Sequence, residues 1–258
     1  MLTYYPGDVQ PDTLALSYGA VINNDGHGFA IVSRGQLIIG HGMDADVMIN
    51  KFARIRSKHH SGPALFHSRM ATAGSINRFN CHPFRIGGDK RTVMAHNGIM
   101  PNSLQPKKGD RRSDTRITAE DLLRGMNLGD ATYRDDLASS IGRWNKLVIL
   151  TVNPAYDSNA YLVNGDQGVW RDGIWYSNYD FEAPYEYGTV AGCDPHAECV
   201  SCASVGTIDA ETVICAVCMI CQDCTEHFDD CDCYLPPADR KPAGGEWWRD
   251  AETAWHAP

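Results

Sequence analysis

The chain has 258 residues, a formal net charge of −9, 43% hydrophobic residues and 21% charged residues. An acidic balance argues against a general affinity for nucleic acid, because binding to phosphates relies on clustered Lys and Arg side chains. No apolar run approaches the roughly 18 residues of a membrane-spanning helix. The first eight residues have neither a basic start nor an apolar stretch, so we expect a cytoplasmic protein that contacts no membrane.

Helices and strands are predicted to alternate in the first part of the chain. Apolar residues at helical spacing predict helices over residues 12–22 and 44–58. A third helix is predicted over residues 117–126, with Thr118 at or near its N-terminal cap. Short apolar segments predict strands at residues 29–32, 36–39, 64–67, 92–95 and 146–152.

Three further strands are predicted around Tyr161, Val169 and Trp175. Asn164-Gly165-Asp166 and Asp172-Gly173 separate them, and such turns favour hairpins because their residues tolerate positive φ. We therefore expect a late antiparallel meander. Strands joined by hairpins, with helices between groups of strands, favour an α+β fold with antiparallel sheets inside and helices outside.

A dense set of polar residues and glycines begins at the end of the strand predicted at 64–67. It reads His67-Ser68-Arg69-Met70-Ala71-Thr72-Ala73-Gly74, then Asn80-Cys81-His82-Pro83-Phe84, then Ala95-His96-Asn97-Gly98-Ile99, and later Ser113-Asp114-Thr115. In this order the set resembles class II glutamine amidotransferases, which carry Arg-x-Ala-Thr-x-Gly, His-Pro, His-Asn-Gly and Ser-Asp-Thr. Asn24-Asp25-Gly26-His27-Gly28-Phe29 resembles a turn of small stand-alone members, so the resemblance covers roughly residues 1–180.

The resemblance implies a fold, an activity and residue roles. The fold would be the four-layer αββα sandwich of N-terminal-nucleophile hydrolases, over residues 1–190, and the activity would convert glutamine to glutamate and ammonia. Asn97 and Gly98 would be catalytic, as donors to the tetrahedral oxyanion. Arg69 would hold the substrate α-carboxylate with its fork of N–H donors, and Asp114 would bind the α-ammonium group. The remaining substrate-binding residues would be Thr72, His82 and His96.

The sequence departs from the family pattern at its N-terminus. Family members attack glutamine with an N-terminal cysteine whose own α-amine is the base, and small relatives generally begin Met-Cys, whereas this sequence begins Met1-Leu2. Three explanations are open. The domain is a non-catalytic descendant, or a cysteine directly before Leu2 has been deleted or replaced, or an unusual nucleophile such as Thr3 or Cys81 acts instead.

Two kinds of function follow from these explanations. An enzyme would bind glutamine or a related amide and, because synthetase members carry a second catalytic domain of several hundred residues, would pass ammonia to a separate acceptor protein. A non-catalytic domain would be a scaffold or interaction protein, for example a component of a larger assembly or of a virus particle.

Nine of the ten cysteines lie between Cys193 and Cys233, which predicts a separate cysteine-rich module over residues 191–235. Thiols clustered in Cys-x-x-Cys pairs indicate metal ligands, and eight thiols would bind about two structural zinc ions. The first site would use Cys199, Cys202, Cys215 and Cys218, and the second Cys221, Cys224, Cys231 and Cys233. Cross-braced pairing is the alternative, and Cys193, His196 and His227 are spare ligands. An iron–sulfur cluster and a disulfide cluster are weaker interpretations.

The charge of this module argues against a nucleic-acid ligand. Between Cys193 and Leu235 there are nine Asp or Glu residues and no Lys or Arg, so phosphates would be repelled. We expect the module to dock on protein or to brace the chain. Residues 236–258 form a tail without clear periodicity, in which the tryptophans are Trp247, Trp248 and Trp255.

Overall fold

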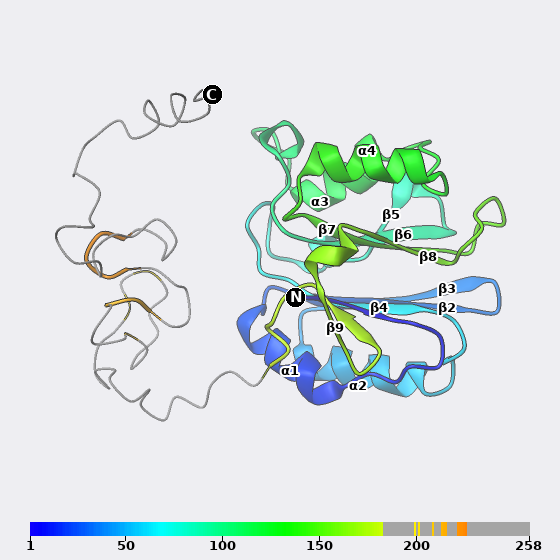
Figure 1. Ribbon diagram of the computed structural model, residues 1–258, viewed down its shortest axis with the longest axis horizontal. Coiled ribbons are helices and arrows are strands. Elements are labelled where there is room, and N and C mark those ends of the chain that lie inside the picture. The colour runs from blue at the N-terminus through cyan, green and yellow to red at the C-terminus, as the bar shows by residue number, and fades with distance from the viewer. Residues whose placement is uncertain (183–198, 200, 202–207, 209–212, 216–220, 226–258) are drawn as a thin grey trace, which may run out of the picture. The chain divides into compact units, whose positions relative to one another are not determined.

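Two antiparallel β-sheets form the framework of the first part of the chain (Figure 1). The computed structural model describes residues 1–182, 199, 201, 208, 213–215 and 221–225. The chain divides into two units, residues 1–184 and 185–258, which are treated separately below.

Sheet A has six strands in the order β3-β2-β4-β1-β10-β9, and sheet B has four in the order β5-β6-β7-β8. The strands of sheet A are β1 (Leu2–Tyr5), β2 (His27–Ser33), β3 (Gln36–Gly42), β4 (Ala64–Ser68), β9 (Val169–Arg171) and β10 (Ile174–Tyr176). Those of sheet B are β5 (Phe84–Arg85), β6 (Thr92–Asn97), β7 (Lys146–Thr151) and β8 (Ala160–Val163).

Helices cover the outer face of each sheet. The α-helices are α1 (Thr13–Ile22), α2 (Ala45–Arg56), α3 (Asp114–Ile117) and α4 (Ala131–Ile141). A π-helical turn, η4 (Thr118–Leu122), continues α3, and the 3₁₀ turns are η1 (Arg78–Asn80), η2 (Ile86–Gly88), η3 (Asn102–Leu104) and η5 (Gly165–Gln167). An aspartate is the N-cap of each helix that covers sheet A. Asp12 accepts a hydrogen bond from Ala15 N and Asp44 accepts one from Val47 N, so a backbone amide at each helix N-terminus is satisfied.

Three apolar clusters fill the spaces between these four layers. One lies between α1, α2 and sheet A, and includes Leu16, Phe52 and Phe66. The second lies between the two sheets, where Leu65 of sheet A and Val148 of sheet B meet Trp175. The third packs sheet B against α4 and η4. Because strand residues alternate between faces, sheet A supplies side chains to both of the first two clusters.

The predicted architecture of antiparallel sheets with helices outside is confirmed for residues 1–182. The helices predicted over 12–22 and 44–58 are present as α1 and α2, and all five short strands predicted between residues 29 and 152 are present. Helix α4 was not predicted. Its only buried residues are Leu137 and Ile141, so its apolar face is too narrow to give a periodic pattern.

The start predicted for the third helix is wrong. The helix begins at Asp114, and Ser113 is its N-cap, accepting a hydrogen bond from Arg116 N at 3.2 Å. The Thr118 hydroxyl instead donates to Asp114 O at 3.0 Å, inside the helix. Serine and threonine side chains can bond to the backbone at either kind of position, so residue type alone did not identify the cap.

The predicted late meander is also wrong, because its strands lie in different sheets. Strand β8 pairs with β7 in sheet B, whereas β9 and β10 form an antiparallel hairpin in sheet A. The turn at Asp172 has the positive φ expected of a hairpin, and Asn164 also has positive φ but begins the crossing between sheets. Trp175 Nε1 donates to Gly165 O at 2.8 Å, which fixes this crossing over the inter-sheet cluster.

In the second unit the described residues form two isolated antiparallel bridges, Ile208 with Cys215 and Ile214 with Cys221. Gln222 N donates to Val213 O at 2.9 Å beside them. The boundary predicted near residue 190 and the tail predicted over 236–258 lie outside the described residues. Within the described part of the chain, the helices are too short or too polar to cross a bilayer.

Arg56, at the end of α2, is fully buried and joins two loops of the first unit. Its guanidinium donates to Val9 O at 3.0 Å and Pro6 O at 2.6 Å on one side, and to Gly62 O on the other.

Arg56→Met would leave these buried carbonyl oxygens without donors, and we expect it to lower the free energy of unfolding by about 3 kcal/mol. Urea unfolding measures this change. Arg54→Met, at an exposed position of the same helix, is the control, and equal effects of the two substitutions would contradict the assignment.

Candidate active site

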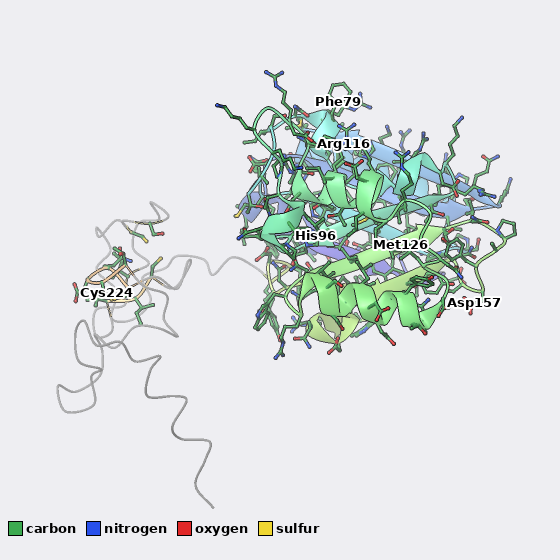
Figure 2. All side chains as sticks on the ribbon, turned by 90° about the horizontal axis from the view of Figure 1, so that it is seen from above. Phe79, His96, Arg116, Met126, Asp157 and Cys224 are labelled. Atoms are coloured by element: carbon green, nitrogen blue, oxygen red, sulfur yellow. The ribbon has the colours of Figure 1, made fainter. Side chains whose placement is uncertain are left out.

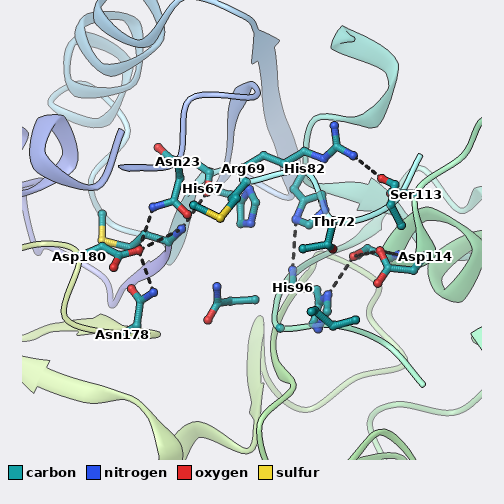
Figure 3. Close-up of a pocket in the computed structure, with 18 of the residues that line it drawn as sticks. Asn23, His67, Arg69, Thr72, His82, His96, Ser113, Asp114, Asn178 and Asp180 are labelled. Atoms are coloured by element: carbon teal, nitrogen blue, oxygen red, sulfur yellow. Dashed lines mark hydrogen bonds and ion pairs between the residues drawn. The ribbon is translucent and has the colours of Figure 1, made fainter. Parts of the chain in front are cut away.

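A pocket of about 310 Å³ opens where the ends of the two sheets meet (Figure 3). It is lined by residues from both sheets and from the loops after β4 and β6. All seven catalytic and substrate-binding residues predicted from the sequence line it: Arg69, Thr72, His82, His96, Asn97, Gly98 and Asp114. These residues are spread over the chain from position 69 to position 114, so the fold brings them together at one place.

A turn before β2 holds the chain around Arg69. Asp25 N donates to Arg69 O, Arg69 N donates to Gly26 O, both at 2.8 Å, and Asp25 Oδ2 accepts from Ala71 N at 2.7 Å. The Arg69 side chain is only 3% exposed. Its guanidinium donates to the carbonyl oxygens of Ala73 and Ser75, at 2.6 and 3.2 Å. Because these acceptors are neutral carbonyls, the charge of Arg69 is not cancelled by a bonded carboxylate.

Asp114 brings a buried negative charge to the same pocket, 4% exposed at the first turn of α3. Its Oδ1 accepts from Thr115 N at 2.7 Å and its Oδ2 from Met100 N at 3.0 Å. Backbone amides therefore hold the carboxylate in place without neutralising it. The pocket thus has a fixed cation and a fixed anion among its lining residues.

Both predicted histidines are buried, His96 on β6 (labelled in Figure 2) and His82 in the loop before β5. His96 Nδ1 lies 2.9 Å from Thr115 Oγ1, and Nε2 lies 2.8 Å from Asn145 Oδ1. Since Oδ1 can only accept, Nε2 carries the hydrogen and Nδ1 accepts from the threonine hydroxyl. Burial lowers the pKa of His96, so its imidazole is neutral at neutral pH.

The ring of His82 packs against that of His67, with centroids 3.9 Å apart and the ring planes tilted by 33°, and His82 Nδ1 accepts from His96 N at 3.4 Å. Burial lowers the pKa of His82 and of His67 well below the usual value, and a neighbouring imidazole lowers each pKa further, that of His96 for His82 and that of His82 for His67. Gly28 of β2 makes room for this loop, because a Cβ atom there would lie 2.0 Å from His82 O. The two rings form an uncharged wall of the pocket.

Gly98 directly follows β6 and has a φ of 135°, which favours glycine. A Cβ atom on Gly98 would also lie 2.5 Å from Asn145 Oδ1, the atom that accepts from His96. Asn145 therefore fixes both the imidazole and the turn beside it, with its own Nδ2 donating to Ile141 O. The turn presents Asn97 and Gly98 to the pocket.

Sequence reasoning missed a second polar group in this pocket, formed by Asn23, Asn178 and Asp180 (Figure 3). Asp180 Oδ2 accepts from Asn23 Nδ2 and from Asn178 Nδ2, both at 2.8 Å. The Met1 amine lies 3.9 Å from the same oxygen. Burial lowers the pKa of this amine to about 5, against the pull of Asp180, so it is neutral at neutral pH and forms no ion pair there. No linear motif joins these residues, which lie at opposite ends of the domain.

Neither unusual nucleophile considered from the sequence lines the pocket. The Thr3 hydroxyl donates to Phe66 O at 3.1 Å within sheet A. The Cys81 thiol is buried against Gly42 O and Met43 Sδ, and burial raises its pKa, which favours the unreactive thiol. The contacts of both side chains thus indicate a role in the fold.

Half of the predicted zinc ligands lie among the described residues. Cys199 Sγ accepts from Ser201 N and from Gln222 Nε2, both at 3.4 Å, and Cys221 is buried beside Ile214. In the described part of the chain no three His, Cys, Asp or Glu side chains form a group that could hold a metal. The other predicted ligands, Cys202, Cys218, Cys231 and Cys233, and the spare candidates Cys193, His196 and His227, lie outside the described residues.

Comparison with known proteins gives one family match and several similar structures. Residues 18–118 match the family model described as class-II glutamine amidotransferases. A B. subtilis glutamine phosphoribosylpyrophosphate amidotransferase complexed with ADP and GMP is 22% identical over 58% of this chain and 35% of its own, with a TM-score of 0.38. An allosteric regulatory enzyme of purine biosynthesis is 20% identical over the same shares, 58% and 35%, with a TM-score of 0.37.

A glutamine aminotransferase class-II domain protein from Silicibacter pomeroyi is 17% identical over 58% of this chain and 72% of its own, with a TM-score of 0.33. The chain thus spans about a third of the length of the first two structures, 35% of each. A search of curated proteins finds no significant match.

The three neutral histidines of the pocket should make stability depend on pH. Their folded-state pKa values are lowered, so the unfolded chain binds protons that the folded chain excludes, and stability is lost as pH falls below about 6.5. Each histidine contributes up to about 1.4 kcal/mol per pH unit. We expect His67→Phe, which keeps an aromatic ring against His82, to reduce this slope, as measured by urea unfolding between about pH 7 and about pH 5. A slope unaffected by His67→Phe would contradict the assignment.

Proposed function

We propose that this chain, whose first unit contains a class II glutamine amidotransferase-like domain, binds glutamine in the pocket and, in a form with an N-terminal cysteine, hydrolyses its side-chain amide to glutamate and ammonia. One observation carries the proposal: residues predicted for this reaction from separate motifs converge on one pocket that holds a fixed cation and a fixed anion.

The charges of the pocket suit a free α-amino acid. The α-carboxylate of glutamine would give the Arg69 guanidinium a negatively charged acceptor in addition to its neutral carbonyl partners, and the planar guanidinium fork is well suited to a carboxylate. The α-ammonium group would lie against Asp114, whose carboxylate the backbone already holds. A ligand with only one of the two charges would leave the other buried side chain without its partner.

The proposed reaction proceeds in two steps. The sulfur of an N-terminal cysteine forms a bond to the amide carbon, the thiol proton passes to the α-amine, and the carbonyl oxygen becomes an oxyanion facing Asn97 and Gly98. The carbon–nitrogen bond then breaks, and the α-ammonium group returns the proton to the leaving nitrogen, releasing ammonia. Water hydrolyses the resulting thioester, which yields glutamate and regenerates the thiol.

The buried histidines support this chemistry without taking part in proton transfer. His96 has both ring nitrogens engaged, by Thr115 and Asn145, so it holds the turn that carries Asn97 and Gly98. Neutral imidazoles add no positive charge beside the α-amine, which must be unprotonated to accept a proton. The ammonia would pass to a separate acceptor protein.

Binding of glutamine can be tested on the chain as it stands. We expect Asp114→Asn to weaken the binding of L-glutamine by about 10- to 100-fold, because a charge-assisted contact to the ammonium group is lost. Glutaramate, which has the amide and the carboxylate but no ammonium group, should bind both proteins equally. Isothermal titration calorimetry measures both ligands.

Asp110→Asn is the matched control, since Asp110 pairs with Arg112 outside the pocket and should not affect either ligand. Equal weakening of glutamine and glutaramate by Asp114→Asn would show that Asp114 only supports the fold. A folded chain that binds no glutamine would overturn the proposed function and favour a scaffold or interaction protein.

We further propose that the cysteine-rich unit binds zinc, in a reducing compartment such as the cytoplasm. The spacing of the cysteines is the main support. In addition, two N–H groups donate to Cys199 Sγ from residues 201 and 222, and hydrogen bonds of this kind favour the thiolate that a metal requires. We expect about two zinc ions per chain by elemental analysis, fewer in Cys215→Ser, and no change in Cys81→Ser. If the protein is purified in the presence of zinc and elemental analysis then finds no bound metal, this proposal is wrong.

A further inference from the structure

Met1 is among the residues that line the pocket, and its side chain packs into the core beside α1. Met1 is 1% exposed and belongs to the cluster between sheet A and its helices. Its thioether packs on α1 so closely that a Cβ atom added to Gly19 would lie 2.1 Å from Met1 Cε. Leu2 faces the opposite way, into the cluster between the two sheets. Because side chains alternate along a strand, a residue joined in front of Met1 would project on the same side as Leu2.

The backbone N–H and C=O groups of Met1 already form hydrogen bonds within sheet A. Met1 N donates to Ser68 O at 2.8 Å, and Ser68 N donates to Met1 O at 2.9 Å, which is a closed antiparallel pair in register with Leu2 and His67. Continuing this register would bring a preceding residue opposite Arg69, which lines the pocket. An amide at Met1 N would keep the same hydrogen bond, so an added residue would not disturb the sheet.

Polar groups of the pocket lie at the start of β1. Asp180 Oδ2 lies 3.9 Å from Met1 N, and Asn178 donates to the same carboxylate oxygen. The other amide atom, Asn178 Oδ1, is buried and has no hydrogen-bond partner. An N–H group would satisfy this acceptor, and an α-amine one residue before Met1 supplies N–H donors at this end of β1.

We infer that the reactive position of this domain is the one immediately before Met1 on β1, and that Asn178 and Asp180 hold the α-amine of a residue at that position. The inference rests on the proposed glutamine hydrolysis and specifies where its nucleophile must lie. A cysteine directly before Leu2, in place of Met1, would instead direct its thiol into the cluster between sheet A and α1, as the Met1 side chain is directed.

Two full-length forms distinguish these positions. In the extended form Met-Cys is joined to Met1, and in the replaced form Met-Cys is joined to Leu2. Mass spectrometry verifies that the initiator methionine has been removed from each. We expect the extended form to release glutamate from glutamine at least about 100-fold faster than the replaced form, because a displaced nucleophile loses a factor of this order. The same extension with serine in place of cysteine is the matched control for contaminating activity.

The outcomes separate this inference from the proposed function. Equal or faster turnover by the replaced form would overturn the inference, and so would inactivity of both forms while glutamine still binds. Loss of glutamine binding in both the chain as it stands and the extended form would overturn the proposed function instead.

The amine-holding role is tested in the extended form with Asn178→Ala. We expect kcat to fall by about tenfold with little change in KM, because the substrate contacts of Arg69 and Asp114 remain. Asp180→Asn should move the acid limb of the kcat/KM profile to lower pH, since a negative charge near an amine favours its protonated form. An acid limb that stays in place would show that Asp180 only supports the fold.

Discussion

The pairing of β1 with β4 in the middle of sheet A determines the geometry of the pocket. Leu2 lies opposite His67, and the hydrogen-bonded pair of Met1 and Ser68 is the last before β4 ends. Beyond that pair the chain turns at Arg69 and enters the pocket-lining loop. A shift of one residue would turn every β1 side chain to the other face, placing Met1 between the sheets and Leu2 against the helices. Packing on both faces of sheet A therefore fixes which end of the chain reaches the pocket, and in which orientation.

The pocket keeps its buried polar groups in place with a small number of shared partners. Asn145 accepts from His96, donates to Ile141 O and leaves no room for a side chain on Gly98. Asp114 is fixed by backbone amides, and Arg69 by backbone carbonyls. These contacts satisfy hydrogen bonds but leave the two opposite charges available to a ligand. Burial also keeps the imidazoles neutral, so the pocket can hold a neutral amine at the end of β1.

Sequence patterns identified elements well where one face of a helix or both faces of a strand were buried. Helix α2 and strand β7 have such patterns, and both were predicted within a few residues. The patterns were less informative where one residue type is compatible with more than one local structure. Asn164 signalled positive φ, which a hairpin and a crossing between sheets both use. The sequence predicted Thr118 as the cap of this helix, and only the hydrogen bond from Arg116 N identified Ser113.

The sequence by itself determined the alternation of helices and strands, because that alternation follows from residue types at short spacing, and its resemblance to class II glutamine amidotransferases implied seven of the residues that line the pocket. It could not determine which sheet β8 joins, since turn residues set local φ and ψ while the choice of neighbour depends on packing between sheets. It also gave no sign that Asn23, Asn178 and Asp180 meet, because residues so far apart share no pattern. The direction of the Met1 side chain was decided only by the tertiary structure, since one strand can present either face until its neighbours and the covering helices fix its register.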